Sequence, residues 1–239
     1  MSTRYRMHFN PLDDVHAAAR DCEIDVFYEE HHNTPGEWAV EYQDYESTST
    51  FIAITDSDGR AVAVSRLIRP GGPGLKTLVD ISQPPWSVDG ERSARAAGVD
   101  LDSTWDVATI AVRKGAGRSG YLTMALLHGL VLTARANNVH YITMILDGRA
   151  RRLLNVMGLP NNPLPGTHPA PYAGLPSAVP AWSNIAVMLD HQRIANPEGY
   201  RLVAQGVGLD DMTVPDVTAF RLGASVADPL GRSRVLEVA

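Results

Sequence analysis

The sequence contains one cysteine, few positive charges and no long apolar run. Cys22 stands alone, which excludes an intrachain disulfide framework and fits a reducing compartment. The 21 Lys and Arg residues are outnumbered by 27 Asp and Glu residues, and this balance argues against general nucleic-acid binding, which needs a basic face. No run approaches the ~18 apolar residues of a membrane span, and no apolar signal segment opens the chain. We therefore expect a cytoplasmic protein without nucleic-acid binding and without a membrane span.

Metal-ligand spacing is also missing. His31 and His32 are adjacent, but neighbours at a helix end point apart, and no third ligand follows at a familiar spacing. We favour solvated histidines over a metal pair, and we expect neither a metal nor a tightly bound cofactor. Cys22 falls inside a predicted helix, where a buried structural thiol is favoured over a nucleophile.

The most informative stretch runs from residue 104 to residue 158. Thr104–Val112 is apolar and β-branched over most of its length, as expected for a strand covered on both faces. One carboxylate, Asp106, lies inside it. A glycine-rich basic loop follows at 113–120, and then a helix with an apolar stripe, a strand at 141–146 and a second helix.

The loop at 113–120 has the composition of an anion site. Free backbone N–H groups and the helix dipole converge where a strand, a glycine-rich loop and a helix meet. On the loop alone, a mobile surface segment with solvated charges is an equal alternative. The candidate phosphate-binding residues are Val112, Arg113, Lys114, Gly115, Gly117, Arg118, Ser119 and Gly120.

The rest of the chain predicts shorter elements. Two strands at 49–55 and 60–68 flank a hairpin turn, and the proline-rich stretch at 160–182 carries enough aromatic and leucine residues to be an ordered loop. The other expectations are a loose arm at 1–10, a helix at 11–31, a flap or acceptor wall at 37–46, a short helix at 91–97, a strand at 183–190, and short helices at 196–205 and 214–222.

This order resembles the acyl-CoA-binding region of the GNAT acyltransferases, and in particular the acyl-homoserine-lactone autoinducer synthases and the long-chain N-acyl amino acid synthases. The loop has the glycines and charge of the GNAT signature but not its spacing. The likeness covers roughly residues 12–190. It rests on WDVATIAV at 105–112, Val-Phe at 26–27, Arg-Leu at 66–67 and Val-Met-Gly-Leu at 156–159.

The resemblance implies an α/β (α+β) fold. We expect a GNAT-like mixed central sheet of about six to seven strands flanked by helices, with a Pro/Gly-rich loop and a short helical C-terminal extension. Residues 1–190 are expected to form the acyltransferase domain. Residues 191–239 are expected to be an extension packed on the same domain.

The implied activity is N-acyl transfer by direct attack of a small amine on an acyl thioester. The donor would be acyl-CoA or an acyl-carrier protein, and in the second case the carrier would also be a partner. The alternative is a non-catalytic acyl-ligand or partner-binding module. The sequence leaves the acyl length, the acceptor and the oligomeric state open.

Asp106 stands where these synthases place a strand glutamate near the acceptor. A carboxylate in an apolar strand needs a partner or a raised pKa, so Asp106 is the best acid–base candidate. The alternative is an ion pair with Arg66 across strands; Arg66 could also hold a substrate carboxylate. The candidate pocket residues are Trp38, Tyr45, Trp105, Thr109, Met144 and Tyr172.

The resemblance also bears on the acceptor. The autoinducer synthases take their amine from S-adenosylmethionine, with arginines at positions that hold Glu23 and Thr109 here. One charge is reversed and a second is lost, which should change the potential of the pocket. We therefore predict a different amine, an amino acid or an amino alcohol, rather than homoserine-lactone synthesis.

Overall fold

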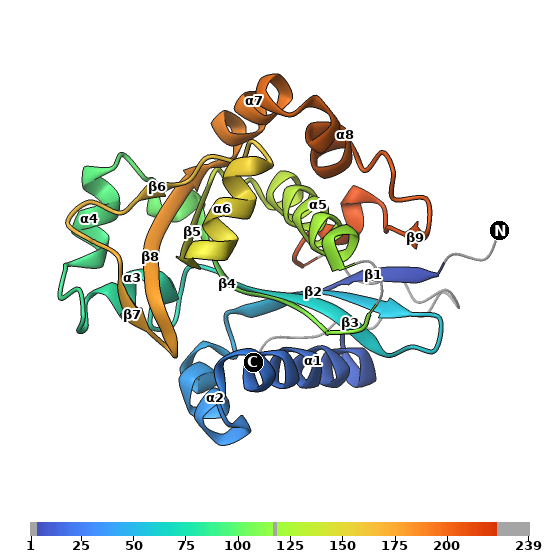
Figure 1. Ribbon diagram of the computed structural model, residues 1–239, viewed down its shortest axis with the longest axis horizontal. Helices are drawn as coiled ribbons and strands as arrows, with labels where there is room; N and C mark the ends of the chain where they lie inside the picture. The colour runs from blue at the N-terminus through green and yellow to red at the C-terminus, as the bar shows by residue number, and fades with distance from the viewer. Residues whose placement is uncertain (1–3, 117–118, 224–239) are drawn as a thin grey trace.

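The computed structural model describes residues 4–116 and 119–223. Over these residues the chain forms one mixed β-sheet with helices on both faces (Figure 1). Its strand order is β6-β8-β5-β4-β3-β2-β1-β9, and β7 also pairs with β8. The strands are β1 (Tyr5–Phe9), β2 (Ser49–Asp56), β3 (Ala61–Ile68), β4 (Thr104–Val112), β5 (Tyr141–Asp147), β6 (Asn162–Pro163), β7 (Ala170–Tyr172), β8 (Leu175–Asn184) and β9 (Met212–Thr213).

The helices divide between the two faces of the sheet. Figure 1 shows α1 and α2 on one side, α5 and α6 on the other, and α7 and α8 beyond α5. The bounds are α1 (Asp13–His31), α2 (Pro35–Tyr42), α3 (Lys76–Ile81), α4 (Gly90–Ala96), α5 (Ser119–Asn137), α6 (Gly148–Val156), α7 (Ile185–Ala195) and α8 (Pro197–Gln205). Within the described ranges, no helix is long and apolar enough to cross a membrane.

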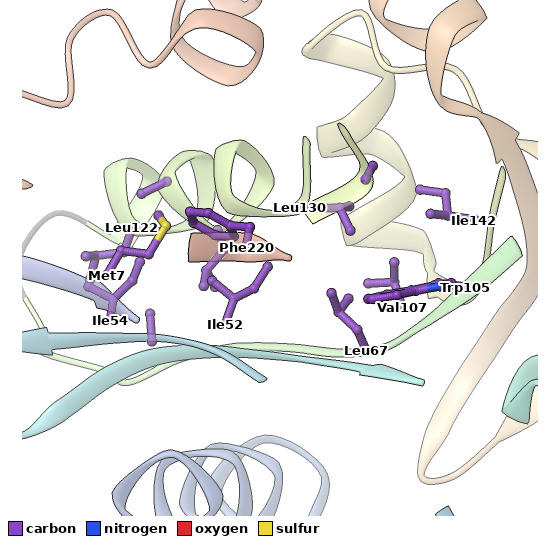
Figure 2. Packing of buried hydrophobic residues seen from close by; sticks show 14 of the residues in the cluster. Met7, Ile52, Ile54, Leu67, Trp105, Val107, Leu122, Leu130, Ile142 and Phe220 are labelled. Carbon is purple, nitrogen blue, oxygen red and sulfur yellow. The ribbon is translucent and has the colours of Figure 1, made fainter. Parts of the chain in front are cut away.

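The central strands contribute buried side chains to both faces of the sheet, because successive side chains of a strand point to opposite sides. On β2, Phe51 joins the cluster beneath α1, where Cys22 is buried, whereas Ile52 joins the cluster beneath α5 (Figure 2). Burial raises the pKa of the Cys22 thiol to about 11, so the predicted buried thiol is confirmed and stays protonated.

A glycine lets α5 lie close to the sheet. A Cβ added at Gly129 would fall 2.9 Å from Ile52 Cγ2 and 3.0 Å from Met7 Sδ, both closer than ordinary contact. Gly129 therefore costs some helix propensity but allows the helix to pack tightly on β1 and β2.

Three sequence expectations need correction. The sheet has more strands than the predicted six to seven, because β1 and the short β6, β7 and β9 join it. Residues 5–9 are not part of a loose arm: β1 pairs antiparallel with β2 and parallel with β9. The strand predicted at 183–190 is also wrong. It ends at Asn184, whose side chain accepts a hydrogen bond from the Val187 N–H and caps α7.

The segments after residue 160 complete the sheet and cover α5. The proline-rich stretch forms β6, β7 and most of β8, and β8 pairs with β5, where the late strand was expected. Further on, α8 packs on α5, and β9 adds a strand beside β1 (Figure 1). The predicted helix at 214–222 is a 3₁₀ turn, Val217–Phe220.

Candidate active site

The site lies where two parallel strands part. β4 and β5 pair only from Thr104 and Tyr141 to Asp106 and Thr143. Beyond that point β5 stays paired with β8, and β4 stays paired with β3. A cavity of about 670 Å³ opens there and is lined by both strands and by helices of both layers. Cavities of this size hold substrate-sized ligands.

One part of this cavity, the apolar limb, extends beneath the helices beyond the sheet. It is lined by hydrophobic side chains, so it suits a hydrocarbon chain. Val131 and Val203 are almost completely buried, which places this lining deep in the molecule. The apolar limb consists of Leu127, Leu130, Val131, Met144, Leu146, Leu154, Leu159, Ile185, Met188 and Val203.

The other part, the polar limb, is built by α2, α3, β4 and β7. These segments bring hydroxyl, carboxylate and ammonium groups to the point where β4 and β5 separate. The polar limb consists of Glu41, Tyr42, Lys76, Asp80, Asp106 and Tyr172.

Asp106 lies at the separation point and is 1% exposed. Its Oδ2 accepts hydrogen bonds from the Thr77 backbone N–H at 2.8 Å and from Thr143 Oγ1 at 2.9 Å. Its Oδ1 is buried and has no hydrogen-bond partner among the described residues. Burial raises the pKa of Asp106 to about 6, and the hydrogen bonds from Thr77 and Thr143 hold it down in part.

The alternative pairing of Asp106 with Arg66 is not formed. A β-bulge shifts the register between β3 and β4, so that Arg66 lies opposite Thr109 and Asp106 lies opposite Ile68. Ala108 is the extra residue of this bulge, and it lines the cavity. Sequence alone could not fix this register, because the bulge changes which residues face each other.

Arg66 forms a buried ion pair with Glu23 instead. The Arg66 Nη2 to Glu23 Oε2 distance is 2.6 Å, and both side chains are almost fully buried. Trp38 Nε1 and Thr109 Oγ1 also donate to the Glu23 carboxylate. Arg66 Nη1 donates to Ser49, and its guanidinium stacks 4.1 Å from the Tyr42 ring centroid.

This pair changes the interpretation of both residues. Arg66 does not line the cavity, and its guanidinium is already held by protein groups, so a contact with a substrate carboxylate is not supported. Glu23 is neutralised by Arg66, so its charge does not act alone on the site. Both residues support the wall formed by Trp38 and Thr109, which do line the cavity.

A second charged cluster consists of Glu41, Lys76, Asp80 and Tyr172, and of these only Tyr172 was predicted as a pocket residue. Lys76 Nζ contacts Asp80 Oδ2 at 2.8 Å and also bonds to Glu41. Tyr172 Oη donates to Asp80 Oδ2 at 2.5 Å. Burial lowers the pKa of Lys76, but the two carboxylates outweigh it and the net shift is upward, so the ammonium stays charged. The cluster is formed by α2, α3 and β7, which are far apart in sequence.

The basic loop meets the first helix. Arg113 pairs with Asp25 at 2.5 Å and donates to the Ala61 carbonyl, and Lys114 pairs with Glu30 at 2.9 Å. Gly115 has φ +74°, which a glycine adopts without strain. Ser119 and Gly120 begin α5, whereas Gly117 and Arg118 lie outside the described residues.

The mouth of the cavity beside this loop includes one cation that sequence reasoning missed. Val112, at the end of β4, and Thr123, in the first turns of α5, line the cavity together with the exposed Arg149 of α6. Of the predicted pocket residues, Met144 and Tyr172 line the cavity. Tyr45 and Trp105 do not: they pack in hydrophobic clusters next to it.

A mixed sheet whose parallel fourth and fifth strands part around a cavity is the fold of the GNAT acyltransferases. No protein-family model and no curated protein matches this chain. Solved structures do match it. The chain is similar to BjaI, a CoA-dependent acyl-homoserine lactone synthase solved with SAM and isopentyl-CoA, with a TM-score of 0.60 and 14% identity over 92% of this chain and 97% of that chain.

Two other solved structures have the same fold. FeeM, an N-acyl amino acid synthase from uncultured soil microbes, matches with a TM-score of 0.60 and 13% identity over 81% of this chain and 98% of its own. The acyl-homoserine lactone synthase LasI matches with a TM-score of 0.50 and 12% identity over 74% of this chain and 87% of its own. At identities of 12–14%, the likeness to these structures shows a shared fold alone.

Proposed function

We propose that this protein is an N-acyltransferase that moves an acyl group from an acyl thioester to a small amine. The observation that carries this proposal is that one cavity joins the apolar limb to a buried carboxylate, Asp106, one oxygen of which has no hydrogen-bond partner among the residues that the structure describes. The apolar limb suits the acyl chain, and Asp106 suits the proton that the amine must lose. The fold, shared with synthases that act on acyl donors, supports the same reading.

In the proposed reaction the amine donates a proton from its ammonium form to Asp106 Oδ1 and attacks the thioester carbonyl. The new C–N bond forms, the C–S bond breaks, and the leaving thiolate takes up the second proton that the nitrogen loses as it becomes an amide. With a pKa of about 6, Asp106 is mostly ionised near neutrality and can accept that proton. We assign stabilisation of the oxyanion to a backbone N–H at the bulge around Ala108, a residue that lines the cavity.

The donor would enter beside the start of α5. Val112 and Thr123 line the cavity there, and Arg149 adds a positive charge that suits a phosphate. We assign the phosphates of the donor to the loop at 113–120 and the first turn of α5, because helix N-termini bind anions. The donor is acyl-CoA or an acyl-carrier protein, and the polar limb receives the amine.

The test is thiol release from acyl-CoAs that range from acetyl to myristoyl, each combined with a panel of primary amines, with the amide product identified by mass spectrometry. We expect release that depends on the amine, and a loss of about a hundredfold or more in Asp106→Asn, the scale of a general base. Asp102→Asn, an exposed carboxylate just before β4, is the matched control and should keep full activity.

Two results would count against this assignment. Tight acyl-CoA binding without amide formation for any amine would favour a non-catalytic binding module. Full activity of folded Asp106→Asn would leave the transferase in place but would show that the proton leaves by another route.

A further inference from the structure

The polar limb holds more negative than positive charge. Among its described residues, the carboxylates of Glu41, Asp80 and Asp106 face a single cation, Lys76. Glu41 and Asp80 already share the Lys76 ammonium, so one negative charge of that trio is not balanced within it. Asp106 adds a further carboxylate, and its Oδ1 has no partner in the part of the chain that the structure describes.

The nearest other buried charges do not alter this balance. Arg66 is paired with Glu23, and the remaining donors of its guanidinium are directed to Ser49 and Glu46. That pair contributes no net charge and lies behind Trp38 and Thr109. Among the described residues of the polar limb, the acceptor therefore meets carboxylates and no guanidinium.

A carboxylate on the acceptor would be badly placed in this limb. To reach Lys76 it would have to displace Glu41 or Asp80, and it would then lie beside the carboxylate that it displaced. Like charges this close repel each other, most strongly at Asp80, whose side chain is 16% exposed, and less at Glu41, whose side chain is 46% exposed and partly screened by water. A second cation on the acceptor would instead find the unbalanced charge of Glu41 and Asp80.

The spacing of these groups limits the length of the acceptor. Asp106 receives its hydrogen bond from Thr77, and Asp80 lies three residues further along the same helix, α3. Three residues cover about one helical turn, roughly 5 Å along the axis. A short alkyl chain covers an axial separation of this size.

Building on the proposed N-acyltransferase activity, we propose that the acceptor is a short diamine without a carboxylate. The reacting nitrogen is held by Asp106 Oδ1, and the second, non-reacting ammonium is held by Glu41 and Asp80. The acceptor class then differs from the amino acid or amino alcohol expected from the sequence, and the amino-acid option relied on Arg66 to bind a carboxylate.

A matched set of amines tests this specificity. Diaminobutane, aminobutanol and aminobutanoate share a chain of four carbons, of which the last is the carboxylate carbon in aminobutanoate, so their kcat/KM values with the best acyl-CoA compare a cation, a neutral group and an anion. We expect diaminobutane to exceed aminobutanol by about tenfold or more, the scale of one charge-assisted contact. Aminobutanoate should be the poorest of the three.

A variant then locates the preference. Glu41→Gln removes one of the two carboxylates that share Lys76, and the diaminobutane-to-aminobutanol ratio of kcat/KM should fall about tenfold, mainly through KM. Asp44→Asn, an exposed carboxylate three residues away that does not line the cavity, is the matched control and should leave the ratio unchanged.

The outcomes separate this inference from the proposed function. If aminobutanoate is acylated as well as diaminobutane, or better, the diamine proposal is overturned and the N-acyltransferase stands. If no amine is acylated from any donor, the proposed function fails. Calorimetry with the same three compounds then still measures their binding to the polar limb. Equal or tighter binding of aminobutanoate than of diaminobutane overturns the inference.

Discussion

Asp106→Asn should make the protein more stable and less active at the same time. The exchange replaces a carboxylate by an amide of almost the same shape. Both hydrogen bonds to Asp106 are received by one oxygen, Oδ2, from the Thr77 N–H and the Thr143 hydroxyl. An amide oxygen can accept both, and the amide NH₂ then takes the place of Oδ1, which has no partner among the described residues.

The size of the stabilisation follows from the raised pKa. Burial moves the pKa of Asp106 from 3.8 to about 6, so the folded protein binds a proton that the unfolded chain has already released. The contribution of Asp106 to the free energy of unfolding is therefore complete below about pH 4 and is lost as the pH rises through about 6. A rise of about two pKa units corresponds to roughly 3 kcal/mol.

Urea unfolding of both proteins between pH 4 and pH 8 measures this effect. Near pH 4 the protonated Asp106 and the amide should give similar free energies of unfolding. Above about pH 6.5 the variant should be the more stable by up to about 3 kcal/mol, less any cost of the new NH₂. For a domain of this size that is a rise in Tm on the order of 6–12 °C.

The control is Asp102→Asn, whose exposed side chain should change the free energy of unfolding by less than about 0.5 kcal/mol. The reasoning is refuted if Asp106→Asn is less stable than the parent at pH 8, or if the difference between them does not change with pH. Either result would mean that the buried carboxylate is compensated by interactions that the described contacts do not contain.

Three further predictions concern other parts of the site. Glu23→Gln leaves Arg66 buried without its counter-charge and should cost about 3–5 kcal/mol in urea unfolding, whereas Glu91→Gln, at an exposed pair with Arg95, should cost less than about 1 kcal/mol; equal costs would contradict the buried pair. Val131→Phe should fill part of the apolar limb and lower kcat/KM for myristoyl-CoA at least about tenfold more than for acetyl-CoA, and an equal loss for both donors would refute that placement. Arg149→Glu should raise the KM for acyl-CoA by about tenfold or more, the scale of a charge-assisted contact, whereas Arg152→Glu on the same helix does not line the cavity and should leave KM unchanged.

The central part of the fold could be predicted from the sequence because its signals are local. β4 is buried on both faces, so it appears as a continuous apolar run, and its predicted bounds agree with the structure. The helix and strand that follow agree with the sequence prediction to within a residue or two. The hairpin of β2 and β3 was equally clear, because a turn motif separates two β-branched runs.

Two errors arose where the local signal was ambiguous. Tyr5 and Met7 are buried and Arg6 is exposed, a strand-like alternation that is too short to recognise beside a chain end. The apolar run after Ser183 fits either a strand or a helix, and only its length and the capping Asn184 favour the helix. Attention to that asparagine as an N-cap would have found α7.

The charged groups of the site could be predicted only one at a time. Asp106 was identified because a carboxylate in an apolar strand is conspicuous. Its separation from Arg66 depends on the bulge at Ala108, and the partner of Arg66 comes from a helix 43 residues away in sequence. Lys76 and Glu41 carry no motif, since their roles follow from how α2, α3 and β7 converge.

The contacts of Arg66 and Lys76 also bear on which acceptor the cavity can bind. The resemblance aligned Glu23 and Thr109 with arginines of the autoinducer synthases; in this structure the two residues bond to each other and to Arg66, so the charge of Glu23 is neutralised inside the wall. The potential that an acceptor meets is instead set by Glu41, Asp80 and Asp106, which are balanced in part by Lys76. We therefore predict that a compound that carries a carboxylate, as S-adenosylmethionine does, binds poorly in the polar limb because of that unbalanced charge.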